Sequence, residues 1–213
     1  TGDNGFAREA SFQSPTGLAL DSSGNLFVSD YLANTIRKIS PDGIIRSYGG
    51  SGRTNIESTN PVIGLRATET DFQGPSGLAL DAAGNLLVVD KLNNRIWKLL
   101  PSGAISVLAG NGQRRASGEN VVAVDSSFNR PSSIAVDRRG RIFVSEEANR
   151  IRVIQPDGLV FTIAGRGPSG LSGDDGPASQ ATLSDPGALA IAPDGAIVFS
   201  DRGNRRLRRL LEP

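Results

Sequence analysis

The sequence predicts an all-β fold, a β-propeller of four-stranded antiparallel blades, and three observations lead to it. One motif recurs four times along the 213 residues. Within each copy, short apolar runs alternate with turns rich in Gly and Pro. No stretch shows the 3.6-residue period of an amphipathic helix. Short antiparallel strands repeated at this spacing are typical of propeller blades, which are stable only beside one another.

The first strand of each copy follows a proline. These prolines, spaced 60, 56 and 55 residues apart, are Pro15, Pro75, Pro131 and Pro186. The runs that follow are GLALD, GLALD, SIAVD and ALAIA. An apolar residue stands three positions before each proline, at Phe12, Phe72, Phe128 and Leu183. The repeated spacing predicts one equivalent strand in every copy.

The second and third strands follow a turn that contains glycine. The second-strand runs are NLFVSD, NLLVVD, RIFVSE and AIVFSD. The third-strand runs are TIRKI, RIWKL, RIRVI and RLRRL. Neighbouring residues such as Leu26 and Phe27 are both apolar, as expected for a sheet that is packed on both faces.

A fourth strand is predicted in three copies only. After a PDG or PSG turn it ends at Gly50, Gly110 or Gly165, whereas the last copy stops after LRRLLEP. We therefore predict fifteen strands in a single domain, 1–213, with blades at about 12–50, 72–110, 128–165 and 183–211. The last blade would lack its outer strand. The chain also begins without Met. We favour the interpretation that it is a piece of a larger five- or six-bladed propeller. The alternatives are a four-bladed ring and two chains that complete one another.

The links between copies are repeated as well. Alanine stands five positions before the apolar residue, at Ala7, Ala67, Ala123 and Ala178, and the first and last links contain GDNG and GDDG. The links span 20 to 24 residues between the closing glycine and the next proline. Connections of that length are often functional.

Composition removes many kinds of enzyme. The chain has no His, Cys or Met, so it has no His-based triad, thiolate metal site or Cys nucleophile. The net charge of +1 gives no general attraction to nucleic acid or acidic lipid. No apolar run approaches the length of a membrane span, and we expect no membrane insertion. Composition leaves the compartment open, and we favour an extracellular or periplasmic setting over the cytoplasm.

The repeated pattern resembles the NHL repeat. The shared motif is P-x-G-L-A-L-D-x-x-G-N-L-x-V-x-D-x-x-N-x-R-I, and the second copy matches it best. Thr35 departs from the motif where Arg is expected, and Glu146 replaces the Asp in a copy that is one residue short. The resemblance covers essentially the whole chain. It implies a propeller, and it implies a binding module with no fixed ligand.

Strand parity places the candidate site. The loops between second and third strands share one end of the blades with the long links, and we call this end the top face. Its Asp-x-x-Asn-x-Arg loops either brace the turns through side-chain hydrogen bonds or form a polar ring for a ligand. The candidate ligand-binding residues are Asp30, Asn34, Asp90, Asn93, Arg95, Glu146, Asn149, Arg150, Asp201, Asn204 and Arg206.

Three further features have a functional and a plain interpretation. Asp174 and Asp175 in GDDG offer carboxylates to Ca²⁺, or they form a solvated turn. The Arg-rich run 202–213 forms a phosphate-binding stripe, or its aliphatic stems pack on the last blade. Trp97 is a ligand platform, or it packs between blades. In each case we favour the plain interpretation, so we expect no cofactor, with Ca²⁺ as the one weak candidate.

The function that follows is a non-enzymatic binding scaffold that uses the top face to recognise a protein or a small ligand. Partners would be a protein or a second copy joined through open blade edges. The first alternative is a hydrolase of the gluconolactonase type that depends on a divalent metal ion. The second is an RNA-binding module, although we do not expect nucleic acid to be the partner.

Overall fold

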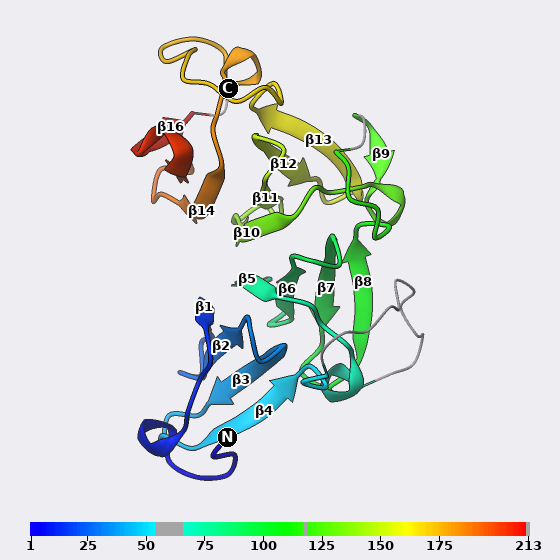
Figure 1. Ribbon diagram of the computed structural model, residues 1–213, viewed down its shortest axis with the longest axis vertical. Coiled ribbons are helices and arrows are strands. Elements are labelled where there is room, and N and C mark those ends of the chain that lie inside the picture. Colours follow the sequence, from blue (N-terminus) through cyan, green and yellow to red (C-terminus); the bar gives the residue numbers. More distant parts are fainter. Residues whose placement is uncertain (54–65, 117–118, 212–213) are drawn as a thin grey trace. The chain divides into compact units, whose positions relative to one another are not determined.

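The computed structural model describes residues 1–53, 66–116 and 119–211, and within them the fold is all β (Figure 1). The chain divides into two compact units, Thr1–Leu108 and Ala109–Pro213. Each unit contains two antiparallel sheets, and each sheet is one predicted blade. This confirms the β-propeller class. The sheet of the last blade has three strands among the described residues.

The sheets of the first unit are simple meanders, with strand orders β1-β2-β3-β4 and β5-β6-β7-β8. Their strands are β1 (Pro15–Leu20), β2 (Leu26–Asp30), β3 (Thr35–Ile39), β4 (Ile45–Gly49), β5 (Pro75–Leu80), β6 (Leu86–Asp90), β7 (Arg95–Leu99) and β8 (Ile105–Ala109), the last of which ends at the unit boundary. Each first strand begins at the repeated proline, a position where the missing N–H costs no ladder bond.

The second unit repeats this order as β10-β11-β12-β13 and β14-β15-β16, with β9 added beside β13. Its strands are β9 (Val121–Val122), β10 (Pro131–Val136), β11 (Ile142–Glu146), β12 (Arg150–Ile154), β13 (Leu159–Ala164), β14 (Pro186–Ile191), β15 (Ile197–Asp201) and β16 (Arg206–Leu210). The two-residue strand β9 was not predicted, because its sequence reads as part of a link.

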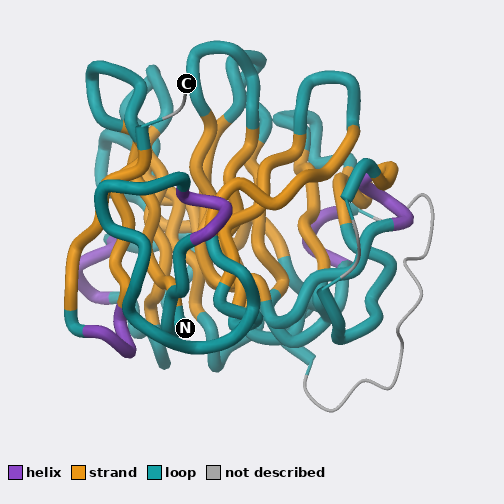
Figure 2. Tube along the Cα trace, turned by 90° about the horizontal axis from the view of Figure 1, so that it is seen from above, coloured by secondary structure: helices purple, strands orange, loops and turns teal. Residues whose placement is uncertain are grey.

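The links contain one-turn 3₁₀ helices, which lie outside the strands (Figure 2). They are η1 (Ala7–Glu9), η2 (Ala67–Glu69), η3 (Ala123–Asp125) and η4 (Ala178–Gln180), and a fifth, η5 (Arg202–Asn204), follows β15. The repeated alanine is therefore the first residue of each link helix. This explains why the same residue recurs at a fixed distance from each blade.

Each of the first three links runs beside the outer strand of the blade that follows it. The N–H of Asn4 donates to the carbonyl of Ile45 on β4 at 2.8 Å. The N–H of Ala67 donates to the carbonyl of Gly103, just before β8, at 2.9 Å. In the third link, β9 pairs with β13. The link thus covers an edge that would otherwise present unpaired backbone groups.

Blades within a unit are joined by close backbone approach. In the first unit, the hydroxyl of Ser29 on β2 donates to the carbonyl of Ser76 on β5 at 2.6 Å. A Cβ on Gly17 of β1 would lie only 2.1 Å from that same carbonyl oxygen. In the second unit, Ser145 on β11 donates in the same way to Gly187 on β14 at 2.7 Å. Small residues at these positions let neighbouring blades touch.

Apolar side chains fill the space within each unit. One cluster in the first unit is formed by Phe27, Ile36, Ala67, Phe72, Leu78, Leu86, Val88, Trp97 and Leu99. Its counterpart in the second unit is formed by Phe143, Ile151, Val153, Ala164, Leu183, Ile197, Phe199 and Leu210. Both clusters draw on two blades and on a link, so burial of apolar area stabilises blades and links together.

Candidate functional site on the top face

The second strand of every blade ends in a buried carboxylate. We call these residues the inner acids, and they are Asp30, Asp90, Glu146 and Asp201. None exposes more than 2% of its surface. A buried charge is costly unless donors surround it, so the partners of the inner acids decide what this region can do.

Each inner acid accepts a hydrogen bond from the backbone just before the first strand of its own blade. These bonds, 2.7 to 2.8 Å long, join Gln13 and Ser14 to Asp30, Gln73 to Asp90, Asn129 to Glu146 and Ser184 to Asp201. The end of each link is thereby fixed against the turn after the second strand. The inner acids brace the top face from within.

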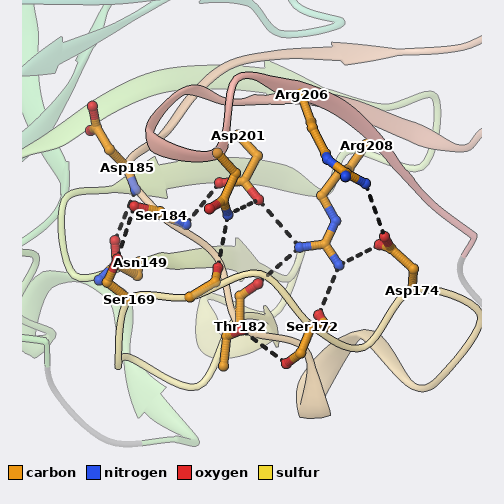
Figure 3. A network of polar contacts seen from close by, with 12 residues as sticks. Asn149, Ser169, Ser172, Asp174, Thr182, Ser184, Asp185, Asp201, Arg206 and Arg208 are labelled. Carbon is orange, nitrogen blue, oxygen red and sulfur yellow. Dashed lines mark hydrogen bonds and ion pairs between the residues drawn. The ribbon is translucent and has the colours of Figure 1, made fainter.

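A further donor comes from the middle of the third strand, which the sequence analysis did not select as a site. The indole Nε1 of Trp97 donates to Asp90 at 2.9 Å. The guanidinium of Arg208 donates to Asp201 at 3.2 Å (Figure 3). Trp97 also packs edge-to-face on Phe72, so it has both a core role and a polar one.

In the third blade the corresponding pair is fully buried. The guanidinium of Arg152 lies 3.6 Å from a carboxylate oxygen of Glu146, and neither side chain is exposed. One signal would have found this position. Side chains two apart on a strand share a face. Arg152 therefore lies on the same face of the sheet as Arg150, which is paired with Glu146.

Burial changes the titration of two inner acids. It raises the pKa of Asp90 to about 6, although hydrogen bonds from Asn93, Gln73 and Trp97 favour the charged form. Burial also raises the pKa of Glu146, opposed by the backbone N–H of Asn129 and the positive charge of Arg152. Both shifts follow from desolvation of the carboxylate.

Two of the candidate asparagines hold neighbouring blades together. Asn34 and Asn149 adopt left-handed backbone conformations, with φ of 55° and 57°. The side-chain Oδ1 of Asn34 accepts from the N–H of Gly74 in the next blade at 3.0 Å, and its side-chain amide donates to the backbone carbonyl of Arg53. Asn149 accepts in the same way from the N–H of Asp185 at 2.9 Å.

The other two candidate asparagines bind the inner acid of their own blade. The amide of Asn93 donates to Asp90 at 2.8 Å, and that of Asn204 donates to Asp201 at 2.9 Å. Each amide also donates to a carbonyl of the link, at 3.2 and 2.8 Å respectively. The first and third blades lack this donor, because Ala33 and Ala148 occupy the position.

The candidate arginines face the inner acids across the sheet. The facing pairs are Asp90 with Arg95, Glu146 with Arg150 and Asp201 with Arg206. In the first blade Thr35 faces Asp30 instead. The charges of Arg95 and Arg150 oppose the rise in pKa of the acids that they face.

The Asp of the GDNG and GDDG links pairs with the third-strand arginine of its own blade. Arg37 donates to Asp3 at 2.5 Å, and Arg208 lies 2.6 Å from Asp174 (Figure 3). Asp174 is thus engaged with a cation, and Asp175 has a left-handed backbone with φ of 64°. Within 1–53, 66–116 and 119–211, no three Asp or Glu side chains gather in one group.

The Arg-rich run forms ion pairs rather than a single basic stripe; its last two residues lie outside the described part of the chain. Arg202 pairs with Asp185 at 2.8 Å, and Arg209 pairs with Asp194. Arg208 is largely buried between its two acids. The paired charges leave less positive potential for phosphate than the sequence alone indicates.

A pocket of about 260 Å³ opens in the first blade. Its walls come from the first link, the turn between β2 and β3, and the outer strand. The lining residues are Thr1, Gly2, Asp3, Ser11, Gln13, Asp30, Ala33, Thr35, Arg37 and Ser47. One predicted site residue, Asp30, lines this pocket, whereas Asp3 and Arg37 were not among the candidates.

These features define a class: a β-propeller of NHL type whose blades are braced by buried acids. The Teneurin NHL domain family matches residues 1–211. The chain belongs to this family. Human Teneurin-1 is 29% identical over 98% of the chain, and chicken (Gallus gallus) Teneurin-1 is 30% identical over 97%. In both cases the chain spans only 8% of the relative's length.

Solved structures share the fold at low identity. A Bacteroides thetaiotaomicron protein of unknown function has a TM-score of 0.72 at 18% identity, covering 92% of this chain and 46% of that one. A gluconolactonase from Xanthomonas campestris has a TM-score of 0.67 at 17% identity, covering 95% and 60%. At these identities the likeness concerns the fold alone. Among the described residues, no helix is long and apolar enough to cross a bilayer.

Proposed function

We propose that this NHL domain is a non-enzymatic recognition scaffold that binds a protein through its top face. The observation that carries the proposal is a pair of exposed apolar side chains on braced turns. Leu32 and Leu92 expose 58% and 41% of their surface. Each stands two residues after an inner acid, Asp30 or Asp90, whose hydrogen bonds fix the turn.

Exposed leucines on rigid turns suit a protein partner. An apolar group that is already fixed loses little conformational entropy when a partner covers it. Scattered exposed apolar residues are common on proteins, but these two recur at the same position of adjacent blades. Tyr31, beside Leu32, adds an aromatic ring of the kind that is enriched at interfaces.

A second copy of the chain is the first partner to test. Blade four offers another route to self-association, because β16 lies at the edge of its described sheet and Leu207 exposes 77% of its surface. The setting that we propose is extracellular or periplasmic. Gluconolactonase chemistry and RNA binding remain the alternatives, and no particular contact among the described residues favours either.

Sedimentation equilibrium over a wide concentration range tests the proposal. We expect concentration-dependent mass for the natural chain and loss of association in Leu32→Asp/Leu92→Asp. Leu207→Asp serves as the matched control on a different surface. Loss of association in the Leu207 variant alone would show that blade four, and not the pair of leucines, forms the contact. A constant monomer mass up to high concentration would exclude a second copy as the partner, and hydrolysis of a lactone substrate would contradict the proposal.

A further inference from the structure

The pocket in the first blade lies where this blade differs from blades two and four. In blades two and four an asparagine amide reaches the inner acid. In blade one that position is Ala33, whose methyl group lines the pocket instead. The turns are otherwise alike. The residue that follows Ala33 or Asn93 has a left-handed backbone conformation in both blades, as Asn34 and Asn94 show.

A second departure concerns the third-strand arginine. In blade four Arg208 contacts both the link acid Asp174 and the inner acid Asp201. In blade one the guanidinium of Arg37 pairs with the link acid Asp3 at 2.5 Å and reaches the carbonyl of Thr1 at 3.5 Å. No ion pair joins it to the inner acid within the described residues.

These departures leave one buried donor without a partner on the pocket wall, and one buried carboxylate that backbone donors alone hold. The side chain of Arg37 is 6% exposed, and its Nε is buried without a hydrogen-bond partner in the described part of the chain. Asp30 is 2% exposed and is held by backbone N–H groups of Gln13 and Ser14. An unmatched buried donor costs free energy that a ligand recovers by accepting from it.

The chemistry of a suitable ligand follows from these groups. Asp30 lacks the side-chain donor that its counterparts in blades two and four have, and Arg37 Nε is a donor without an acceptor. Asp3 and Arg37 pair with each other, whereas no ion pair reaches Asp30 in the described part of the chain, and an unpaired carboxylate favours a cation. The pocket volume of about 260 Å³ corresponds to roughly nine waters, enough for a small organic molecule.

We propose that this pocket binds a small hydroxylated amine, whose ammonium donates to Asp30 and whose hydroxyl accepts from Arg37 Nε. The proposal goes beyond the proposed function, and it places a small-molecule site beside the same β2–β3 turn that carries Leu32. The ammonium takes the place that the asparagine amide has in blades two and four. Ser11, Gln13 and Ser47 offer further polar contacts on the wall.

A matched pair of probes tests the charge requirement. 2-Amino-1,3-propanediol and glycerol have the same skeleton, and only the first carries an ammonium group at neutral pH. Saturation-transfer NMR and amide shift titration of the full chain report binding. We expect the amine to bind at least tenfold more tightly than glycerol. Equal binding of both probes, or binding of neither, would overturn the proposal.

Variants that refill the pocket test its place. Ala33→Asn restores the amide of blades two and four, so we expect a folded protein that loses at least tenfold in amine affinity. Thr35→Arg, which mimics Arg95 and Arg206, gives a second filled variant should the first be unstable. Ala148→Asn makes the same change before the left-handed Asn149 of blade three, and it should leave amine binding intact.

Unchanged amine binding in both filled variants would place the ligand elsewhere and refute the assignment. This result is separate from the self-association test. The leucine variants leave the pocket residues unchanged, and the pocket variants leave the exposed leucines in place. Failure of one proposal is therefore distinguishable from failure of the other.

Discussion

Asp90 illustrates how a single buried residue links structure to pH. The folded chain keeps this carboxyl protonated up to about pH 6, whereas an unfolded Asp releases its proton near pH 4. The folded state then binds more protons between these values, so stability falls as the pH rises from about 4 to about 6. The raised pKa of Glu146 acts in the same direction.

We expect Asp90→Asn to remove part of this pH dependence. The difference in unfolding free energy between the natural chain and the variant should change by roughly 3 kcal/mol at most between pH 4 and pH 6.5. Urea unfolding at several pH values measures it. Carboxyls with lowered pKa, such as Asp81 and Asp137, contribute stability that is lost only at more acid pH. Identical pH profiles for both proteins would contradict the assignment.

The buried pair of Glu146 and Arg152 gives a second prediction. Arg152→Met leaves the carboxylate buried opposite an apolar group, and we expect a loss of about 3–5 kcal/mol in unfolding free energy. Adding Glu146→Leu should recover much of the loss, because no buried charge remains. Arg209→Met, which removes an exposed ion pair with Asp194, is the control and should cost under about 1 kcal/mol. Equal losses in the two single variants would refute this account.

Single residues also show where sequence reasoning stopped. The inner acids recur in the sequence, and the structure places each of them at the end of a second strand. The asparagines recur as well, but they occupy two different positions of the turn and have different partners. Arg37 and Arg152 give no such signal, because their sequence pattern is that of ordinary strand residues. The pocket depends on what blade one lacks, and an alanine at position 33 gives no signal until its neighbours are known.

At the scale of elements, the strands were predictable and the links were not. Prolines, glycine turns and apolar runs predict the strands of all four blades, because local turn chemistry and packing agree. The 3₁₀ helix at Ala67 and the strand β9 depend instead on contacts with an outer strand distant in sequence. A repeat pattern reveals that such residues matter, without showing what they touch.

The contact between β1 and β5 yields a prediction at the scale of elements. A methyl group at Gly17 would meet the backbone of Ser76 at 2.1 Å, which requires the two strands to separate. We expect Gly17→Ala to destabilise the first unit by about 1–3 kcal/mol. Gly176→Ala, whose nearest atom would be 3.6 Å away in an exposed link, serves as the control. Thermal unfolding measures both, and an unchanged midpoint in the first variant would refute the close contact.

At the scale of the whole molecule, four similar blades differ in how their edges are covered. In blades one to three the third strand lies between the second strand and an outer strand, whereas β16 has neighbour β15 alone within the described residues. We expect amide hydrogens of β16 to exchange with deuterium faster than those of β3, β7 and β12. Mass spectrometry of peptic peptides reports the order, and equal protection in all four strands would show that β16 is covered in solution.

The pairing of each link with the outer strand that follows it has a consequence for inheritance. A segment made of a link and the blade that follows it, such as Gly2 to Gly50 or Glu119 to Gly165, contains both the outer strand and the residues that cover its edge. A gene duplication that begins at a proline such as Pro131 would separate a blade from its own edge cover. Duplication or deletion of blades should therefore be tolerated at the starts of links, and the boundaries of an ancestral repeat should lie there.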